Sequence, residues 1–263
     1  MIKKLVLCVL VIHSIINQAS AANPCYGHNE MLNIVDRPNN ADSACTVPAG
    51  KVEFELGYQN QTLREPGVRQ QNFPSGELRL GLAHDNEIYI NLPNYIQQSA
   101  FPTAGFTQTS GGLKHQLWYN QDLLFTVEGS VNLPDGSAAF GNKHAGGAFN
   151  GIISYNVNSR LNLTLMAGGS STSEARQNGG QRFYSLNPDF VATLVLNDKT
   201  NLYGEVFGQS KTGYGEGSGF NVDAGILYLI QPRVVLDASI SQRLSGYPNG
   251  FERYVGAGIS VMM

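Results

Sequence analysis

The sequence predicts one antiparallel β-barrel of about twelve strands that crosses a membrane. Three observations predict it. From residue 51 onward, apolar and polar residues alternate with a period of two, which is the period of a strand. Tight turns alternate with longer connections. Only 14% of the 263 residues are charged, against about 25% in an ordinary soluble domain, as expected when one side of every strand faces lipid.

Composition argues against several other classes of protein. The mean hydropathy of −0.16 is too low for a helical membrane protein, and beyond the N-terminus no apolar run approaches the roughly 18 residues of a membrane-spanning helix. Aromatic and β-branched residues occur along the whole chain, which argues against disorder. The net charge is −3 and no basic cluster is present, which argues against nucleic-acid binding.

Residues 1–21 have the features of a cleaved export signal. Lys3 and Lys4 precede a short apolar run, and residues 19–21 read Ala-Ser-Ala, a cleavage site of small residues. One alternative is a membrane anchor, for which the run is too short. The other is a lipoprotein signal at Cys8, where the preceding leucine is too bulky. Cleaved export and a barrel together predict the outer membrane of a Gram-negative bacterium.

Residues 22–49 are expected to form an N-terminal segment on the periplasmic side, followed by the barrel of residues 50–263. The segment contains Cys25 and Cys45, the two cysteines left after cleavage. In an oxidising compartment they are expected to pair, and a closed loop of this size contributes about 3 kcal/mol on chain-entropy reasoning. Two free thiols are the alternative.

The strands and their connections follow the alternation. Strands are expected around residues 52–58, 77–82, 87–92, 107–119, 122–133, 146–157, 160–170, 182–197, 201–210, 219–230, 233–243 and 251–263. Tight turns are expected at 85–86, 120–121, 158–159, 198–200 and 231–232, and longer connections at 64–75, 93–106, 134–145, 171–181, 211–218 and 244–250. Short and long connections alternate throughout, as in outer-membrane barrels with short periplasmic turns and long external loops, whereas the links of a soluble sandwich vary.

Aromatic residues of the apolar parity lie near the two ends of the expected strands. Near the tight turns they are Tyr119, Tyr155 and Tyr228, and near the long connections they are Tyr58, Phe149, Tyr184 and Phe220. Two such belts around an apolar band are typical of a lipid-facing surface. The alternative is that these aromatics fill the core of a soluble β-fold.

The opposite parity carries the charged residues of the strands and predicts the inner face. The candidates for the lumen are Glu53, Glu55, Glu77, Arg79, Glu87, Lys114, Glu128, Glu205, Asp223, Asp237 and Arg243. The same parity carries apolar residues such as Leu124, Ile152 and Val191, so the interior is mixed. Twelve strands leave both a narrow pore and a filled lumen open. Eight acids against three bases favour water inside, because a buried acid needs a partner.

A short motif precedes the first strand. Asp36-Arg37-Pro38 leads to residues 47–50, Val-Pro-Ala-Gly, and the strand then reads Glu55-x-Gly57. This opening resembles the outer-membrane β-barrel transporter family named after the meta pathway of phenol degradation, as does the closing strand. The resemblance implies passage of small, often apolar or aromatic compounds. It implies no catalytic residues.

The motif also has a physical interpretation. Its prolines keep the segment extended and prevent a helix. The segment is expected either to fold into the periplasmic mouth, with Arg37 against luminal acids such as Glu53 or Glu55, or to remain a solvated tether.

The sequence therefore predicts an outer-membrane channel or transporter that passes small solutes, including apolar or aromatic compounds, through a narrow acidic and amphipathic lumen. One alternative is a structural or surface-binding barrel that contacts its partner through the long loops. A lipase or protease is the other, but His115 lies at the periplasmic end, His144 lacks acidic neighbours, and no nucleophile or metal motif is present. No enzyme and no cofactor are expected.

The expected partners are outer-membrane lipid, the barrel-assembly machinery and a small-molecule solute, with no nucleic acid. The sequence leaves open the identity of the solute, the direction of transport and the oligomeric state.

Overall fold

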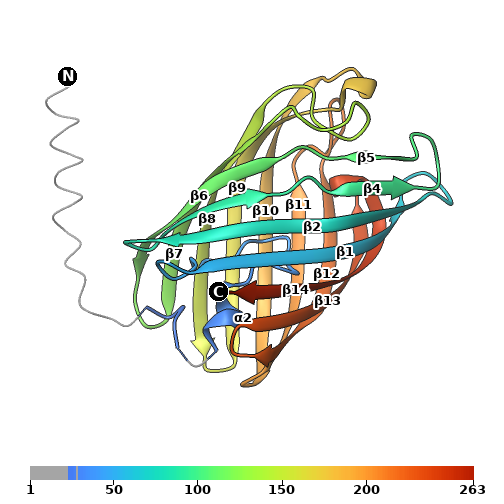
Figure 1. Ribbon diagram of the computed structural model, residues 1–263. Helices are drawn as coiled ribbons and strands as arrows, with labels where there is room; N and C mark the ends of the chain where they lie inside the picture. The colour runs from blue at the N-terminus through green and yellow to red at the C-terminus, as the bar shows by residue number, and fades with distance from the viewer. Residues whose placement is uncertain (1–22, 28) are drawn as a thin grey trace, which may run out of the picture.

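The computed structural model describes residues 23–27 and 29–263, and it is a closed antiparallel barrel (Figure 1). The predicted export signal, residues 1–21, lies outside the described residues. Within the described part of the chain, no helix combines the length and the apolar character needed to cross a bilayer.

The barrel wall is built from fourteen strands. They are β1 (Val52–Leu63), β2 (Arg69–Leu82), β3 (Asn86–Asn91), β4 (Tyr95–Gln98), β5 (Ala104–Phe106), β6 (Ser110–Tyr119), β7 (Leu123–Asn132), β8 (Gly146–Asn158), β9 (Leu161–Ser173), β10 (Arg182–Asn197), β11 (Thr200–Gln209), β12 (Gly219–Gln231), β13 (Val234–Ser245) and β14 (Phe251–Met262). The short helix α2 (Glu30–Ile34) precedes them, and the 3₁₀ turns η1 (Arg176–Asn178) and η2 (Pro248–Gly250) lie in two of the longer connections.

These strands occupy twelve positions around the barrel. β3 and β4 both pair with β2, so together they fill one position. β6 pairs with β3 and β5 pairs with β4, so β6 and β5 together fill the next position. The remaining strands pair with their sequence neighbours, and β14 closes the barrel on β1. The predicted fold class, an antiparallel barrel of about twelve strands with alternating short and long connections, is confirmed.

Two predicted connections are shorter than expected. β2 begins at Arg69, so the connection predicted at 64–75 spans only 64–68, and the one predicted at 93–106 contains β4 and β5. The first half of β2 has β4 as its partner, which extends both strands toward the loops. Pro93 lies between β3 and β4 and has no N–H group to donate to a neighbouring strand. The sequence therefore predicted a loop where β4 follows β3.

The two faces of the wall differ as predicted. Outward residues such as Leu113, Phe149 and Ile240 are each about three-fifths exposed. Inward residues such as Lys114, Ile152 and Glu205 are buried. Tyr119 is the exception among the aromatics of the predicted belts. A bulge between Gln116 and Trp118 shifts the strand, so Tyr119 packs against the internal cluster. A bulge breaks the period of two and cannot be recognised from alternation.

The N-terminal segment lies inside the barrel, near the end where the short turns and the C-terminus lie (Figure 1). We call residues 23–27 and 29–49 the plug. Its apolar residues, with Met31, Ile34 and Val47 almost fully buried, join one cluster with inward residues of the wall such as Ile152 and Val191. Burial of these side chains away from water stabilises the plug in the lumen.

Candidate functional site

Arg79 of β2 is the centre of a buried ion-pair network between the wall and the plug. Its guanidinium is fully buried and lies 2.9 Å from Glu53 and 2.8 Å from Glu87. Two parallel N–H donors reach Glu87, the arrangement that makes an arginine–carboxylate pair strong. A third nitrogen donates to the backbone carbonyl of Ile34 in α2, at 2.7 Å. Arg79 therefore binds the plug and three neighbouring strands together.

The plug residue Asp36 makes the second ion pair. Lys114 Nζ of β6 lies 3.0 and 3.1 Å from the two carboxylate oxygens of Asp36. One of these oxygens also accepts the backbone N–H of Ser43 at 2.6 Å. The acid of the Asp36-Arg37-Pro38 motif therefore ties two parts of the plug to the wall.

Arg37 contacts the wall through its backbone and its side chain. The backbone N–H groups of Asp36 and Arg37 both donate to Glu55 at 2.9 Å. The Arg37 guanidinium donates to Asp237 of β13 at 3.2 and 3.3 Å. The side chain crosses Gly57 of β1, where any Cβ atom would overlap the guanidinium. The Glu55-x-Gly57 pattern thus accepts the motif and leaves room for it. Of the two acids named as candidates for Arg37, Glu55 is contacted through the backbone N–H of Arg37, whereas Glu53 pairs with Arg79.

Acids on the opposite side of the barrel bind backbone N–H groups of the plug. Glu205 of β11 accepts from Asn40 and Ala41 at 2.8 to 3.0 Å. The Asn40 side chain donates to Asp189 of β10 at 2.8 Å. Asp189 is not among the residues predicted for the lumen, although it shares the inward parity of Val191, which could have identified it.

The other predicted lumen residues take different places. Glu128 accepts from Asn150 at 2.7 Å, and Asp223 accepts from the Tyr254 hydroxyl at 2.8 Å. Glu77 is half-buried, and its carboxylate lies within 4.8 Å of those of Asp36 and Glu55.

Arg243 is not brought to the plug. It pairs with Glu252 at 2.9 Å near the loop end of β13, where its guanidinium also lies 4.5 Å from the centre of the Tyr247 ring. Among the described residues, the bases that contact lumen acids are therefore Arg79, Lys114 and the plug's own Arg37.

In the described part of the chain, each of these lumen acids except Glu77 has a hydrogen-bond or ion-pair partner, although the bases are fewer than the acids. The sequence predicted eight wall acids and three wall bases in the lumen. With Asp189 added and Arg243 placed near the rim, the described wall contributes nine acids and two bases. The count omits Arg37 and the backbone N–H groups of the plug, which donate to Glu55, Glu87 and Glu205. Backbone N–H groups make charge-assisted hydrogen bonds to a carboxylate and stabilise its charged form, as a nearby cationic side chain does.

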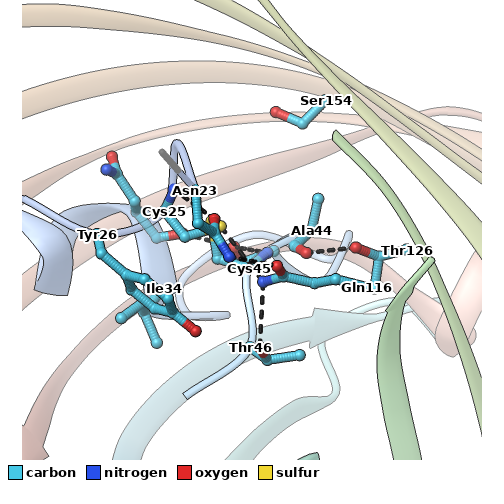
Figure 2. The surroundings of a disulfide bond; sticks show 12 residues. Asn23, Cys25, Tyr26, Ile34, Ala44, Cys45, Thr46, Gln116, Thr126 and Ser154 are labelled. Carbon is cyan, nitrogen blue, oxygen red and sulfur yellow. Dashed lines mark hydrogen bonds between the residues drawn. A yellow bond between two sulfur atoms is a disulfide. The ribbon is translucent and has the colours of Figure 1, made fainter. Parts of the chain in front are cut away.

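A disulfide closes the plug into a ring. Cys25 and Cys45 are joined, as the sequence predicted. Beside the bond, Gln116 of β6 donates to Thr46 and accepts from Asn23, at 3.1 and 2.7 Å, and the Thr126 hydroxyl donates to the Ala44 carbonyl (Figure 2). Both ends of the ring are therefore fixed to the same part of the wall.

Two cavities lie on either side of the plug. One, of about 440 Å³, reaches the short-turn end and is lined by the turn residues Asn158 and Ser159 and by the inner wall of β7 to β12. The other, of about 370 Å³, is lined by the loop-side parts of β1 to β3 and β6. Arg37, Asn39 and Asp42 line both cavities. These plug residues therefore form the partition between the two halves of the lumen.

The first cavity has a neutral, amphipathic wall. Ser154, Asn156, Asn162 and Thr164 form a hydrogen-bonded group on β8 and β9, with distances of 2.8 to 3.3 Å. Apolar residues of the internal cluster, among them Leu124, complete the lining. On β8 and β9 the cavity offers hydroxyl and amide groups beside an apolar surface, whereas its charged lining residues are Arg37 and Asp42 of the plug and Asp122 in the turn before β7.

Asp42 should make the stability of the protein depend on pH. Burial and, after it, the negative charge of Glu128 raise the pKa of Asp42 to about 8, against the opposing charges of Lys114 and Arg79. Between pH 4 and 8, roughly, the folded state keeps a proton that the unfolded state releases. The contribution of Asp42 to stability therefore falls as pH rises through that range and levels off above it.

The matched variant is Asp42→Asn, which cannot titrate. We compare the free energies of unfolding of the two proteins by urea unfolding from pH 4 to 9. Relative to Asp42→Asn, the wild type should lose stability as pH rises to about 8 and should then level off. Parallel pH profiles of the two proteins would contradict this.

The family model described as "Putative MetA-pathway of phenol degradation" matches residues 35–263. No curated protein matches the chain. An outer membrane channel from Pseudomonas putida F1 shares the fold with a TM-score of 0.66 and 11% identity, over 86% of this chain and 100% of that one. The NanC porin has a TM-score of 0.55 at 9% identity (80% and 98% covered), and the KdgM porin 0.53 at 8% (79% and 98%).

Proposed function

Because the chain belongs to the family described as "Putative MetA-pathway of phenol degradation", we propose that it is an outer-membrane channel for small solutes whose lumen is closed by the plug. The observation that carries the proposal is the pair of cavities separated by Arg37, Asn39 and Asp42. Displacement of these residues would join the cavities into one passage. Solved barrels of this fold include an outer membrane channel and two porins, which supports the same function.

The lining of the first cavity supports neutral, partly apolar solutes. A compound with an aromatic body and a hydroxyl group would pack against Leu124 and exchange hydrogen bonds with Asn162 or Thr164. A strongly charged solute would lose its hydration without finding an ion-pair partner on this wall. The description of the family refers to phenol degradation, which agrees with this class.

The two histidines weighed as catalytic give no support to an enzyme. In the described part of the chain, neither the His115 ring nor the His144 ring is hydrogen-bonded to a carboxylate or a serine; the His144 contact to Ser173 runs through the backbone. We therefore assign neither residue a role in the proposed function.

Filling the first cavity should slow solute passage. Ser154 of β8 lines this cavity, and its neighbour Ile153 faces outward. In liposome-swelling assays with small neutral solutes, we expect Ser154→Trp to reduce the rate several-fold and Ile153→Trp to leave it unchanged. A folded protein that passes no solute and no ions, both with the plug and after deletion of residues 22–49, would favour the structural or surface-binding alternative. Equal rates for both variants would exclude the path along β8.

A further inference from the structure

Two arginines stand in one row on the outward face of the barrel. The register pairs Thr62 of β1 with Arg69 of β2 on one side and with Arg253 of β14 on the other. Gln242 of β13, opposite Arg253, continues the row. The row lies at the loop ends of these strands, one or a few residues from where each strand begins or ends.

The acidic residues of the described strands around this row face inward. In β1, β2 and β14, as in β12 and β13, each acidic residue has the inward parity, and Glu252 is paired with Arg243 near the rim. Both arginines are exposed, and neither guanidinium donates a hydrogen bond to another described residue. A charge held in this way at the edge of an apolar surface is stabilised when an anion from outside accepts its hydrogen bonds.

The arginines are close enough to act together. They are separated by one strand, so their backbones lie about 10 Å apart. Arginine side chains of this length can converge on one phosphate or clamp two adjacent ones, each through parallel N–H donors.

A groove of about 510 Å³ continues from the arginines across the wall. Its loop end is polar, with Arg69, Arg253 and Gln242, and its other end is apolar, with Ile240 and Val255 in the next row of the register. The groove thus has a cationic end and an apolar end, which match the headgroup and an acyl chain of an anionic lipid. A free phosphate would contact the cationic end alone.

We propose that this groove binds a phosphorylated glycolipid of the lipid A class, with the phosphates on Arg69 and Arg253 and an acyl chain along Ile240 and Val255. In an outer-membrane barrel the long loops are external, so the row lies at the level of the outer leaflet. The inference rests on the outer-membrane location in the proposed function, but it does not depend on whether the lumen conducts.

Lipid A that co-purifies with the protein provides the test. The double variant Arg69→Gln, Arg253→Gln keeps the polar size of the side chains and removes both charges. The control is Arg160→Gln, Arg233→Gln, which removes two exposed arginines at the short-turn end. After detergent extraction and size-exclusion chromatography, mass spectrometry should find bound lipid A in the wild type and the control, and several-fold less in the double variant. Heat-modifiable migration on gels verifies that each variant is folded.

Defined lipids then separate the possible sources of binding. Native mass spectrometry with lipid A, dephosphorylated lipid A and phosphatidylglycerol should rank lipid A first for the wild type. Equal retention of dephosphorylated lipid A, equal retention by the double variant, or a dimer interface covering the row would each overturn the proposal. Loss of lipid A with wild-type conductance is expected of the double variant. A protein that binds lipid A but does not conduct even after deletion of residues 22–49 would refute the proposed function alone.

Discussion

Deleting residues 22–49 should raise the single-channel conductance several-fold and make the channel cation-selective. The plug fills the centre of the lumen and separates the two cavities, so its removal leaves one continuous passage. The acids that had accepted its N–H groups, Glu55, Glu205 and Asp189 among them, would then be hydrated and unpaired. Rings of carboxylates in a water-filled pore favour cations. Planar-bilayer recording of the wild type and the deletion gives both quantities.

A milder variant separates gating from a change in folding. Asp36→Asn with Arg37→Gln keeps the plug but weakens its contacts to Lys114 and Asp237. We expect brief openings of the size seen in the deletion, against a mostly closed background. Unchanged conductance in a folded deletion protein would show that the plug does not close the passage.

Arg79→Met should destabilise the protein by about 3–5 kcal/mol, the range for breaking a buried ion pair from one side. Methionine approximates the length of the side chain but leaves Glu53 and Glu87 buried without their shared partner. The carbonyl of Ile34 also loses its donor, so the plug should loosen along with the wall. Urea unfolding in detergent micelles or vesicles measures the loss.

The matched control is Arg243→Met. Its ion pair with Glu252 is half-exposed near the rim, so its removal should change stability little. Adding Glu53→Gln and Glu87→Gln to Arg79→Met should restore part of the stability, because neutral amides tolerate burial better than unpaired carboxylates. Equal losses for the two arginine variants would mean that the buried network contributes no more than a rim contact.

The wall could be predicted from the sequence because its signal is repeated along each strand. A residue such as Leu113 faces lipid while Lys114 faces inward, and the same rule holds on the neighbouring strands. It fails where the backbone breaks the rule, at the bulge beside Tyr119 and at Pro93. At each place a single residue changes the backbone pairing, and such a local change cannot be recognised from an alternation that extends over a whole strand.

The plug was predicted only as one of two possibilities, because its contacts leave little trace in residue types. Asn40 and Ala41 bind Glu205 through backbone N–H groups, which every residue except proline has. Only the Asp36-Arg37-Pro38 motif carried a recognisable pattern, and it indicated Glu55 correctly but not Asp237. The mixed inner face was the other signal, since apolar residues such as Ile152 inside the barrel have the plug as their partner.

The many attachments of the plug around the wall bear on how the barrel reaches its correct strand register. Residues 34–47 hydrogen-bond to Arg79, Glu205 and Asp237, which lie on widely separated strands. A slip of one residue in any of these strands would turn its charged side chain into lipid and leave a plug group unsatisfied. The disulfide-closed plug can therefore act as a template for assembly. Each hairpin satisfies its contacts to the plug only in the correct register, before β1 and β14 pair and close the barrel.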